Sequence, residues 1–440
     1  MAWTSSAVKA QSTPVAGDAA SEKPQVVASI DASAPALVSP DASAAGAATD
    51  QAAATDANDY AFYSDALAGT GEFCRLIADE AAYSAPDIKD RNCSNAFAET
   101  APEVPVVVNG RVRSFIEYFQ SNGRKHFARW LGRSQTYMSM LRNVLRENGL
   151  PEDLSYIAFI ESGLNPTAKS RAKAVGMWQF VKGTAQKYGL RVNWWIDERM
   201  DPEKATQAAA QYFKDLYGQF GSWYLAAAGY NAGEGTVLRA MKRHGTEDFW
   251  ELASYRRPLR RETKEYVPKY LAAMLIAKDP QSYGFDEENA GEGLAYDKVR
   301  VSQATDLRVI AKAAGTTAEE IKRLNPELLR WFTPPDYPDY EIKIPAGSAR
   351  RFEENIKNIP VRRRVVFIKH RVIRRETIAK IAKKYRVPVG EIIHLNNLRV
   401  ARRRRIRLKP GTVIFIPVRA GNFKRNRAVA HTVSILEYQS

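Results

Sequence analysis

The stretch Glu161-Ser-Gly-Leu-Asn-Pro166 stands directly after an apolar run, Tyr156–Ile160, in a chain of 440 residues. Residues 152–162 are predicted to form a short apolar helix that carries Glu161 near its end, beside hydrophobic side chains. Desolvation disfavours the charged form of a carboxyl group, so such a Glu can stay protonated near neutral pH and donate a proton. Taken alone, however, an exposed Glu at a helix end explains this residue better.

The region around Glu161 has a helical pattern, and residues 111–285 are predicted to form one all-α domain. No convincing alternation of apolar and polar residues occurs between positions 111 and 280. Ser134 is a candidate N-cap for a helix that ends before Pro151, and Asp201 is a candidate N-cap for an Ala-rich helix. The further predicted helices are Pro202–Tyr217, Trp223–Tyr230 and Thr263–Ala277.

The pattern changes after residue 290, where a β-α-α-β unit occurs twice. The matching positions lie 71 residues apart: Leu307, Ile310, Ala311, Ile321, Leu324 and Asn325 against Ile378, Ile381, Ala382, Ile392, Leu395 and Asn396. This repetition predicts two small α+β domains at 296–347 and 365–418. The remaining 419–440 is a basic tail, in which His431–Val433 resembles the start of a truncated third copy.

The N-terminal part of the chain carries no functional signal. Residues 1–57 are rich in Ala and Ser and predict a disordered segment, and 58–110 form a weakly patterned extension. The start lacks the apolar core of a secretory signal, so a signal was removed, the start is artificial, or the protein stays inside. Cys74 and Cys93 are as consistent with two free thiols as with a disulfide. No apolar run is long enough to predict a transmembrane segment.

Positive charge is concentrated near the C-terminus. The chain has a net charge of +16, whereas residues 362–427 alone hold 22 Lys and Arg against two Glu. Such a segment attracts acidic polymers, including cell-wall components and nucleic acid. Because no DNA- or RNA-binding signature accompanies it, nucleic-acid binding is the minority interpretation, and a solvated basic face is the simplest one.

Three further polar segments follow Glu161 in order. They are Ser170 with Gly176-Met-Trp-Gln179, then Gly229-Tyr-Asn-Ala-Gly233, then Glu262-Thr-Lys-Glu-Tyr266. Glu262 and Tyr266 share one helix face because they are four residues apart. Each segment alone is also typical of an ordinary turn or an exposed helix.

Together these segments resemble the lytic transglycosylase family, whose catalytic domain is similar to goose-type lysozyme. The resemblance covers roughly residues 113–280 and rests on Glu161-Ser162, on Ser170 nine residues later, on Gln179, on the Gly229–Gly233 turn and on the late Glu262…Tyr266 helix. The sequence departs from the family at Met177-Trp178, where Leu-Met is usual, and at Gly229, where Ala is usual. A lysozyme-like, mainly α catalytic domain is therefore expected.

The resemblance implies a reaction at the β-1,4 bond between N-acetylmuramic acid and N-acetylglucosamine in peptidoglycan. Glu161 would protonate the glycosidic oxygen and then, as a carboxylate, remove the proton of the muramyl O6, which gives a 1,6-anhydro end. The implied substrate-binding residues are Ser162, Ser170, Gln179, Tyr230, Asn231, Glu262 and Tyr266. Neither a metal ion nor another cofactor is implied.

Two alternatives remain open at this point. Hydrolysis of the same bond, as in a goose-type lysozyme, needs a base for water, and Asp197, Glu198 and Asp201 are candidates, although capping is the better interpretation for Asp201. The other alternative is a wall- or nucleic-acid-binding protein without catalytic activity, which the presence of Glu161 disfavours.

The second repeat resembles a LysM domain, a module that binds the N-acetylglucosamine units of glycans. The matching segments are Ile378–Ala382, Tyr385–Val389, Leu395–Leu398, Lys409–Gly411 and Ile414–Pro417, whereas Arg375-Glu376-Thr377 replaces the usual Gly-Asp-Thr. The first repeat is more degenerate. Glycan strands of peptidoglycan are the expected partner. Because peptidoglycan lies outside the cytoplasmic membrane, a periplasmic or secreted, envelope-associated location is expected.

Overall fold

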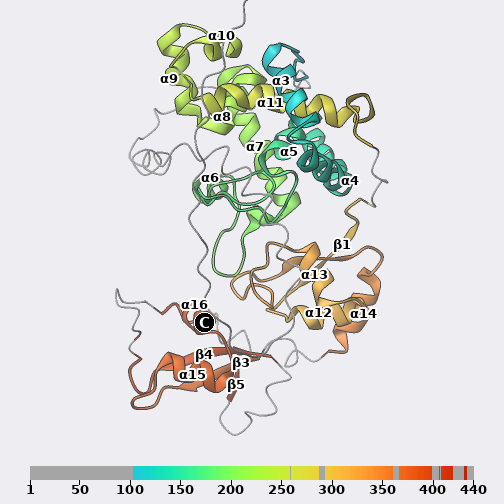
Figure 1. Cartoon of the computed structure of the whole chain (residues 1–440). Helices are drawn as coiled ribbons and strands as arrows, with labels where there is room; N and C mark the ends of the chain where they lie inside the picture. The colour runs from blue at the N-terminus through green and yellow to red at the C-terminus, as the bar shows by residue number, and fades with distance from the viewer. Residues whose placement is uncertain are drawn as a thin grey trace, which may run out of the picture. The chain divides into compact units, whose positions relative to one another are not determined.

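A computed structural model of the chain describes residues 103–257, 259–286, 293–359, 366–398, 406, 408–419 and 431–433 (Figure 1). The predictions for segment 1–57, for most of segment 58–110 and for both cysteines lie outside the described residues. Within the described ranges, no helix is long and apolar enough to cross a membrane.

The first part of the described chain, up to Tyr283, contains helices and loops but no named strand, as predicted. Its α-helices are α3 (Gly110–Gln120), α4 (Arg124–Glu147), α5 (Ser155–Ser162), α6 (Lys182–Lys187), α7 (Pro202–Phe220), α8 (Trp223–Ala232), α9 (Glu234–His244), α10 (Phe249–Ser254) and α11 (Arg261–Lys278). Three short 3-10 turns, η1 (Glu152–Leu154), η2 (Glu198–Met200) and η3 (Gln281–Tyr283), accompany them. The sequence pattern did not predict α6, α9 and α10.

The expected N-cap at Ser134 is wrong, because this residue lies inside α4. Its hydroxyl donates to the carbonyl of Leu131 at 2.6 Å, within the same helix. A Ser side chain in a helix can bond to a carbonyl one turn earlier instead of capping a new helix. Phe127 and Trp130 extend the buried face of α4 in the N-terminal direction, so the helix begins at Arg124, well before Ser134.

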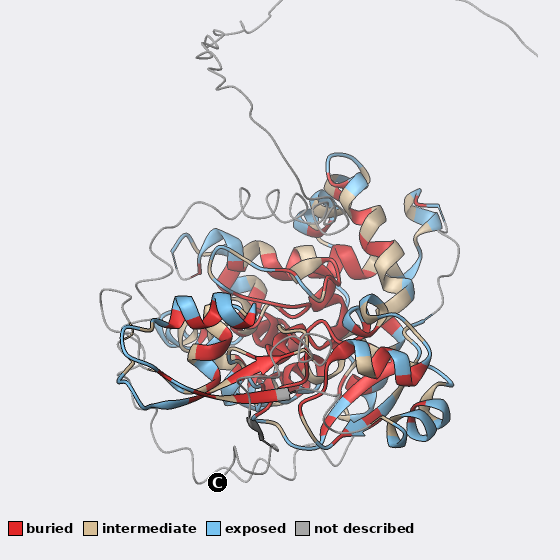
Figure 2. Cartoon of the chain, turned by 90° about the horizontal axis from the view of Figure 1, so that it is seen from below, coloured by how far each residue is buried: buried red, intermediate tan, exposed pale blue. Residues whose placement is uncertain are grey.

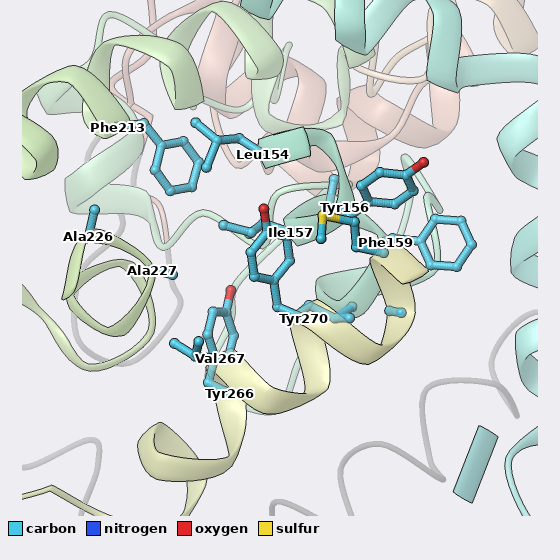
Figure 3. Packing of buried hydrophobic residues seen from close by; sticks show 14 of the residues in the cluster. Leu154, Tyr156, Ile157, Phe159, Phe213, Ala226, Ala227, Tyr266, Val267 and Tyr270 are labelled. Carbon is cyan, nitrogen blue, oxygen red and sulfur yellow. The ribbon is translucent and has the colours of Figure 1, made fainter. Parts of the chain in front are cut away.

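The core of the helical domain includes α5, in which every residue from Ser155 to Ile160 is buried. Figure 2 shows buried residues gathered in the interior of the described chain. Helix α11 packs against α5 and places Tyr266, Val267 and Tyr270 in this core, as Figure 3 shows. Both tyrosines are directed from α11 toward Ile157 and its neighbours on α5. Burial of large apolar side chains supplies most of the favourable free energy of folding, and here it fixes the end of α5 relative to α11.

Two β-α-α-β units follow, which confirms the predicted mixture of a mainly α domain and small α+β units. The first repeat unit contains β1 (Tyr296–Val301), α12 (Leu307–Ala314), α13 (Ala318–Leu324) and β2 (Tyr340–Pro345), followed by α14 (Ala349–Lys357). Strands β1 and β2 pair antiparallel, with Tyr296 opposite Pro345 and Val301 opposite Tyr340. Ile310, Ile321 and Ile342 form the centre of its core with no exposed surface.

The second repeat unit contains β3 (Val366–Arg371), α15 (Ile378–Tyr385), α16 (Val389–Leu395) and β4 (Val413–Val418). Strand β3 lies between β4 and β5 (His431–Val433) and pairs antiparallel with both. The segment expected to start a third copy therefore adds a strand to the second unit's sheet. Whether that segment also begins a further domain stays a prediction.

Candidate active site

Glu161 occupies the last turn of α5, where the helix meets the polar surface. Gly163 ends the helix with left-handed backbone angles (φ 57°), a conformation that glycine adopts without steric cost. The Gly163 site also admits no side chain, because an added Cβ would lie 2.1 Å from the ring of Trp130. Helix α5 therefore ends one residue after Glu161.

The carboxyl group of Glu161 is desolvated. Burial raises the pKa of Glu161 to about 7, the repulsion of Glu262 adds to this rise, and a hydrogen bond from Tyr266 and the charge of Lys269 oppose it. A carboxylic acid with this pKa exchanges its proton near neutral pH, as a group that acts first as an acid and then as a base must do.

Tyr266 of α11 orients that carboxyl group. Its phenol donates to Oε1 of Glu161 at 2.6 Å, and the ring is 93% buried by its neighbours, with 7% exposed. Among the described residues, the structure records no other hydrogen bond to the carboxyl group of Glu161. Tyr266 was expected to bind substrate, and the structure places its phenol against the carboxyl group of Glu161, a contact that was not predicted.

The residues 168–180, called here the polar loop, lie beside the end of α5. Ser162 connects the two by donating to the carbonyl of Met177 at 2.9 Å. Within the loop, the hydroxyl of Ser170 accepts from the N–H of Ala174 at 2.9 Å. The side-chain amide of Gln179 donates to the carbonyl of Gly176 at 2.7 Å. Ser170 and Gln179 thus shape the loop itself, in addition to any contact with a substrate.

Tyr230 and Asn231, at the end of α8, connect this helix to the polar loop and to α11. The phenol of Tyr230 donates to the carbonyl of Trp178 at 2.6 Å, and its ring stacks on Phe213 with centroids 4.8 Å apart. Asn231 donates to Oε1 of the exposed Glu262 at 3.5 Å. The two turns that the sequence analysis associated with Glu161 therefore meet at one site.

The sequence analysis missed two residues of this site. Thr263 donates to the side-chain oxygen of Asn231 at 3.0 Å, which fixes the orientation of that amide. Lys269 lies one turn after Tyr266 on α11, and burial lowers the pKa of its ammonium to about 8. Its position, seven residues after Glu262 and three after Tyr266, places it on the same helix face, and this spacing was the available signal.

The acidic residues that were candidates for a hydrolytic base have other partners. They lie in residues 193–201, called here the junction loop. Asp197 pairs with Arg199 at 2.7 Å, Glu198 with Lys204 at 2.6 Å, and Asp201 with Lys343 at 2.7 Å.

Asp201 also accepts from the N–H groups of Glu203 and Lys204, which confirms the predicted N-cap. Across the described ranges, no group of three or more His, Cys, Asp or Glu is arranged to hold a metal ion.

Family models match three successive segments of the chain. Residues 139–253 match the transglycosylase SLT domain, 295–361 match the LysM-like domain of lytic transglycosylase MltD, and 370–417 match the LysM domain. The chain therefore combines an SLT transglycosylase domain with two domains of LysM type, in the order that the sequence analysis predicted.

The chain is homologous to membrane-bound lytic murein transglycosylase D of Escherichia coli K12, with 29% identity over 303 residues. The alignment covers 64% of this chain and 64% of that protein, so the chain spans just under two thirds of its relative's length. A peptidoglycan transglycosylase of phage T7 is 41% identical over 104 residues, which cover 23% of this chain and 8% of the phage protein.

Among solved structures, the 70 kDa soluble lytic transglycosylase of Escherichia coli is 21% identical and superposes with a TM-score of 0.30, over 40% of this chain and 31% of that one.

Proposed function

We propose that the chain is a peptidoglycan lytic transglycosylase that cleaves the bond from N-acetylmuramic acid to N-acetylglucosamine and leaves a 1,6-anhydromuramyl end. The observation that carries the proposal is the pairing of Glu161, with its pKa near 7, and the phenol of Tyr266. The SLT domain match and the homology to a murein transglycosylase support the same substrate class.

In the proposed reaction, protonated Glu161 gives its proton to the glycosidic oxygen as the bond to C1 of the muramyl residue breaks. The 2-acetamido oxygen of that sugar bonds to C1 in its place, as in substrate-assisted glycosidases. The Glu161 carboxylate then takes the proton of the muramyl O6 while O6 displaces the acetamido oxygen from C1. Atoms balance without water, and Glu161 ends protonated for the next cycle.

The other site residues bind and orient the sugar in this proposal. Ser170 would orient the acetamido group, Gln179, Tyr230 and Asn231 would hold the sugar, and Glu262 would offset positive charge near C1. Hydrolysis is the second candidate function. It is disfavoured by the three ion pairs of the junction loop, because a base for water needs a carboxylate that is not already neutralised.

The two repeat units fit a protein that works at the cell wall. We propose that the second unit binds N-acetylglucosamine-containing glycan, with its basic neighbouring residues adding attraction to acidic wall polymers. Glu376 of this unit accepts from the N–H of Ile373 at 3.1 Å and contacts His370 at 2.8 Å, so the unusual Arg375-Glu376-Thr377 turn has an ordered side chain. A periplasmic or secreted, envelope-associated location follows from this proposal.

The test is digestion of purified sacculi, with the products read by mass. The wild type is expected to release fragments that end in 1,6-anhydromuramic acid, lighter by one water than reducing ends. Glu161→Gln is expected to release essentially none. Glu152→Gln makes the same chemical change at a surface ion pair with Arg146 and is expected to be fully active. Reducing ends as the main product would favour hydrolysis, and an active Glu161→Gln would rule out the proposed acid.

A further inference from the structure

The first repeat unit is joined to the junction loop by main-chain hydrogen bonds. The N–H of Asp197 donates to the carbonyl of Glu327 at 2.9 Å, and the N–H of Leu329 donates to the carbonyl of Trp195 at 2.9 Å. Between these bonds, Ile196 is only 1% exposed, and its side chain belongs to the hydrophobic core of the first repeat unit. The junction loop is therefore built into that unit like an additional short strand.

A buried ion pair completes this connection. Nζ of Lys343 lies 2.7 Å from Oδ1 of Asp201, and the two side chains are 6% and 3% exposed. Asp201 also caps α7, and nearby Tyr340 donates to Oε1 of Glu327 at 2.6 Å. A buried pair costs desolvation when it forms, but loss of one partner leaves an uncompensated charge, so each partner holds the other in place.

Arg199 connects the junction loop to the polar loop. Its guanidinium donates to the carbonyls of Lys173 and Phe180, both at 3.0 Å, and makes two bonds with Asp197 at 2.8 and 2.7 Å. The main chain also touches here, because a Cβ added at Gly176 would lie 1.8 Å from the carbonyl oxygen of Arg199. The buried Arg199 thus contacts the polar loop at its middle and at its C-terminal end.

We propose that the first repeat unit holds the polar loop in position and does not serve to bind the glycan as a tether. Arg199 is the positioning residue that connects this unit, through the junction loop, to the polar loop. The continuous series runs from the unit's Lys343 and Glu327, through the junction loop, to Lys173 and Phe180. This inference rests on the proposed function only in assuming that the polar loop binds the reacting sugar.

Two substrates separate scaffolding from tethering. A short soluble glycan fragment tests the catalytic site alone, whereas intact sacculi also require tethering. Lys343→Met breaks the link from the unit to the junction loop, and Arg199→Lys breaks the link to the polar loop because one ammonium cannot replace the four guanidinium bonds. Each is expected to lower kcat at least tenfold on both substrates, by misplacing the sugar. Arg350→Ala, at an exposed pair on α14, is the control and should match the wild type.

Amide hydrogen exchange of residues 168–180 in the full chain gives a readout that does not need activity. Lys343→Met and Arg199→Lys are expected to speed this exchange at least tenfold and to leave α8 and α11 protected. If Lys343→Met does not fold, Ile196→Ala is measured in its place. The scaffold proposal would be overturned by a folded variant that keeps the wild-type amide exchange and the wild-type kcat on the short fragment. It would also be overturned by a variant that loses activity on sacculi alone. An inactive wild type would instead refute the proposed function, while the exchange data still decide the scaffold.

Discussion

Tyr266 donates a hydrogen bond of 2.6 Å to Glu161 across 105 positions of sequence. The bond stabilises the carboxylate and opposes the desolvation that raises its pKa, so the two effects together set the value near 7. It also fixes the position of Oε1 of Glu161 against the phenol of Tyr266. Removal of the Tyr266 phenol is therefore expected to change both the pKa and the orientation of the Glu161 carboxyl group.

Tyr266→Phe is expected to move the alkaline limb of the pH–rate profile upward by about one pH unit. Removing a hydrogen bond of about 1.4 kcal/mol raises the pKa of Glu161 by about one unit. The rate follows this pKa because the acid must be protonated for the first step. The maximal rate should fall roughly tenfold because the carboxyl group loses its orientation. The measurement is kcat/KM on soluble glycan between pH 5 and pH 9.

Tyr270→Phe is the matched control, because Tyr270 lies on the same helix as Tyr266 but its phenol donates to the carbonyl of Asp153, at 3.1 Å, and not to Glu161. The control should keep the wild-type profile. A Tyr266→Phe profile that superposes on the wild type would mean that this hydrogen bond does not govern the acid.

Lys269→Gln is expected to shift the same limb upward as well. The positive charge of Lys269 lowers the pKa of Glu161, so removing the charge raises it. Burial lowers the pKa of Lys269 to about 8, so its full charge is present only below that pH. The difference in kcat/KM between the variant and the wild type should therefore be largest below pH 8. Lys278→Gln, at the far end of α11 and paired with Asp153, should change nothing. A downward shift in Lys269→Gln would contradict the assigned sign.

Stability of the first repeat unit is expected to fall as pH rises from about 4.5 to about 7. Burial and the charge of Asp201 raise the pKa of Glu327 to about 7, against the opposing effects of Lys343 and the Tyr340 phenol. A carboxyl group whose pKa is raised by folding binds its proton more tightly in the folded state, so deprotonation destabilises that state. The measurement is the thermal unfolding midpoint at pH 5 and pH 8.

Glu327→Gln is expected to lose this pH dependence and to unfold at a higher temperature than the wild type at pH 8. Glu341→Gln is the control, since Glu341 is an exposed residue of β2 that lies 3.5 Å from Lys298. Equal pH dependence in the wild type and in Glu327→Gln would assign the effect to other groups.

Gly176→Ala is expected to destabilise the helical domain by about 2 kcal/mol or more and to abolish activity. The residue has φ 89°, outside the favoured region for side chains, and the new methyl group would overlap the carbonyl of Arg199. Gly183→Ala, in α6 with no atom within 4 Å of the new Cβ, should instead stabilise by about 0.5–1 kcal/mol. The measurement is the free energy of unfolding of both variants in denaturant. A Gly176→Ala protein as stable as Gly183→Ala would contradict the described packing.

The helical domain, the repeated α+β units and the position of Glu161 at the end of an apolar helix could be predicted from the residues alone. These follow from local periodicity, because side chains three or four residues apart share a helix face and need no distant partner to do so. Local signals failed at Ser134, where a residue typical of caps lies within a long helix, since buried contacts on both sides outweigh the capping preference.

The partner of each polar group, by contrast, depends on how distant segments pack together. The meeting of Glu161 with Tyr266, the contribution of Lys269, and the pairing of Asp201 with Lys343 join segments far apart in the chain. Spacing along a chain carries no information about such contacts, because they arise when packed helices exclude water and set charges and donors at fixed distances. The same burial gives Glu161 a pKa that an exposed Glu in the same sequence would not have.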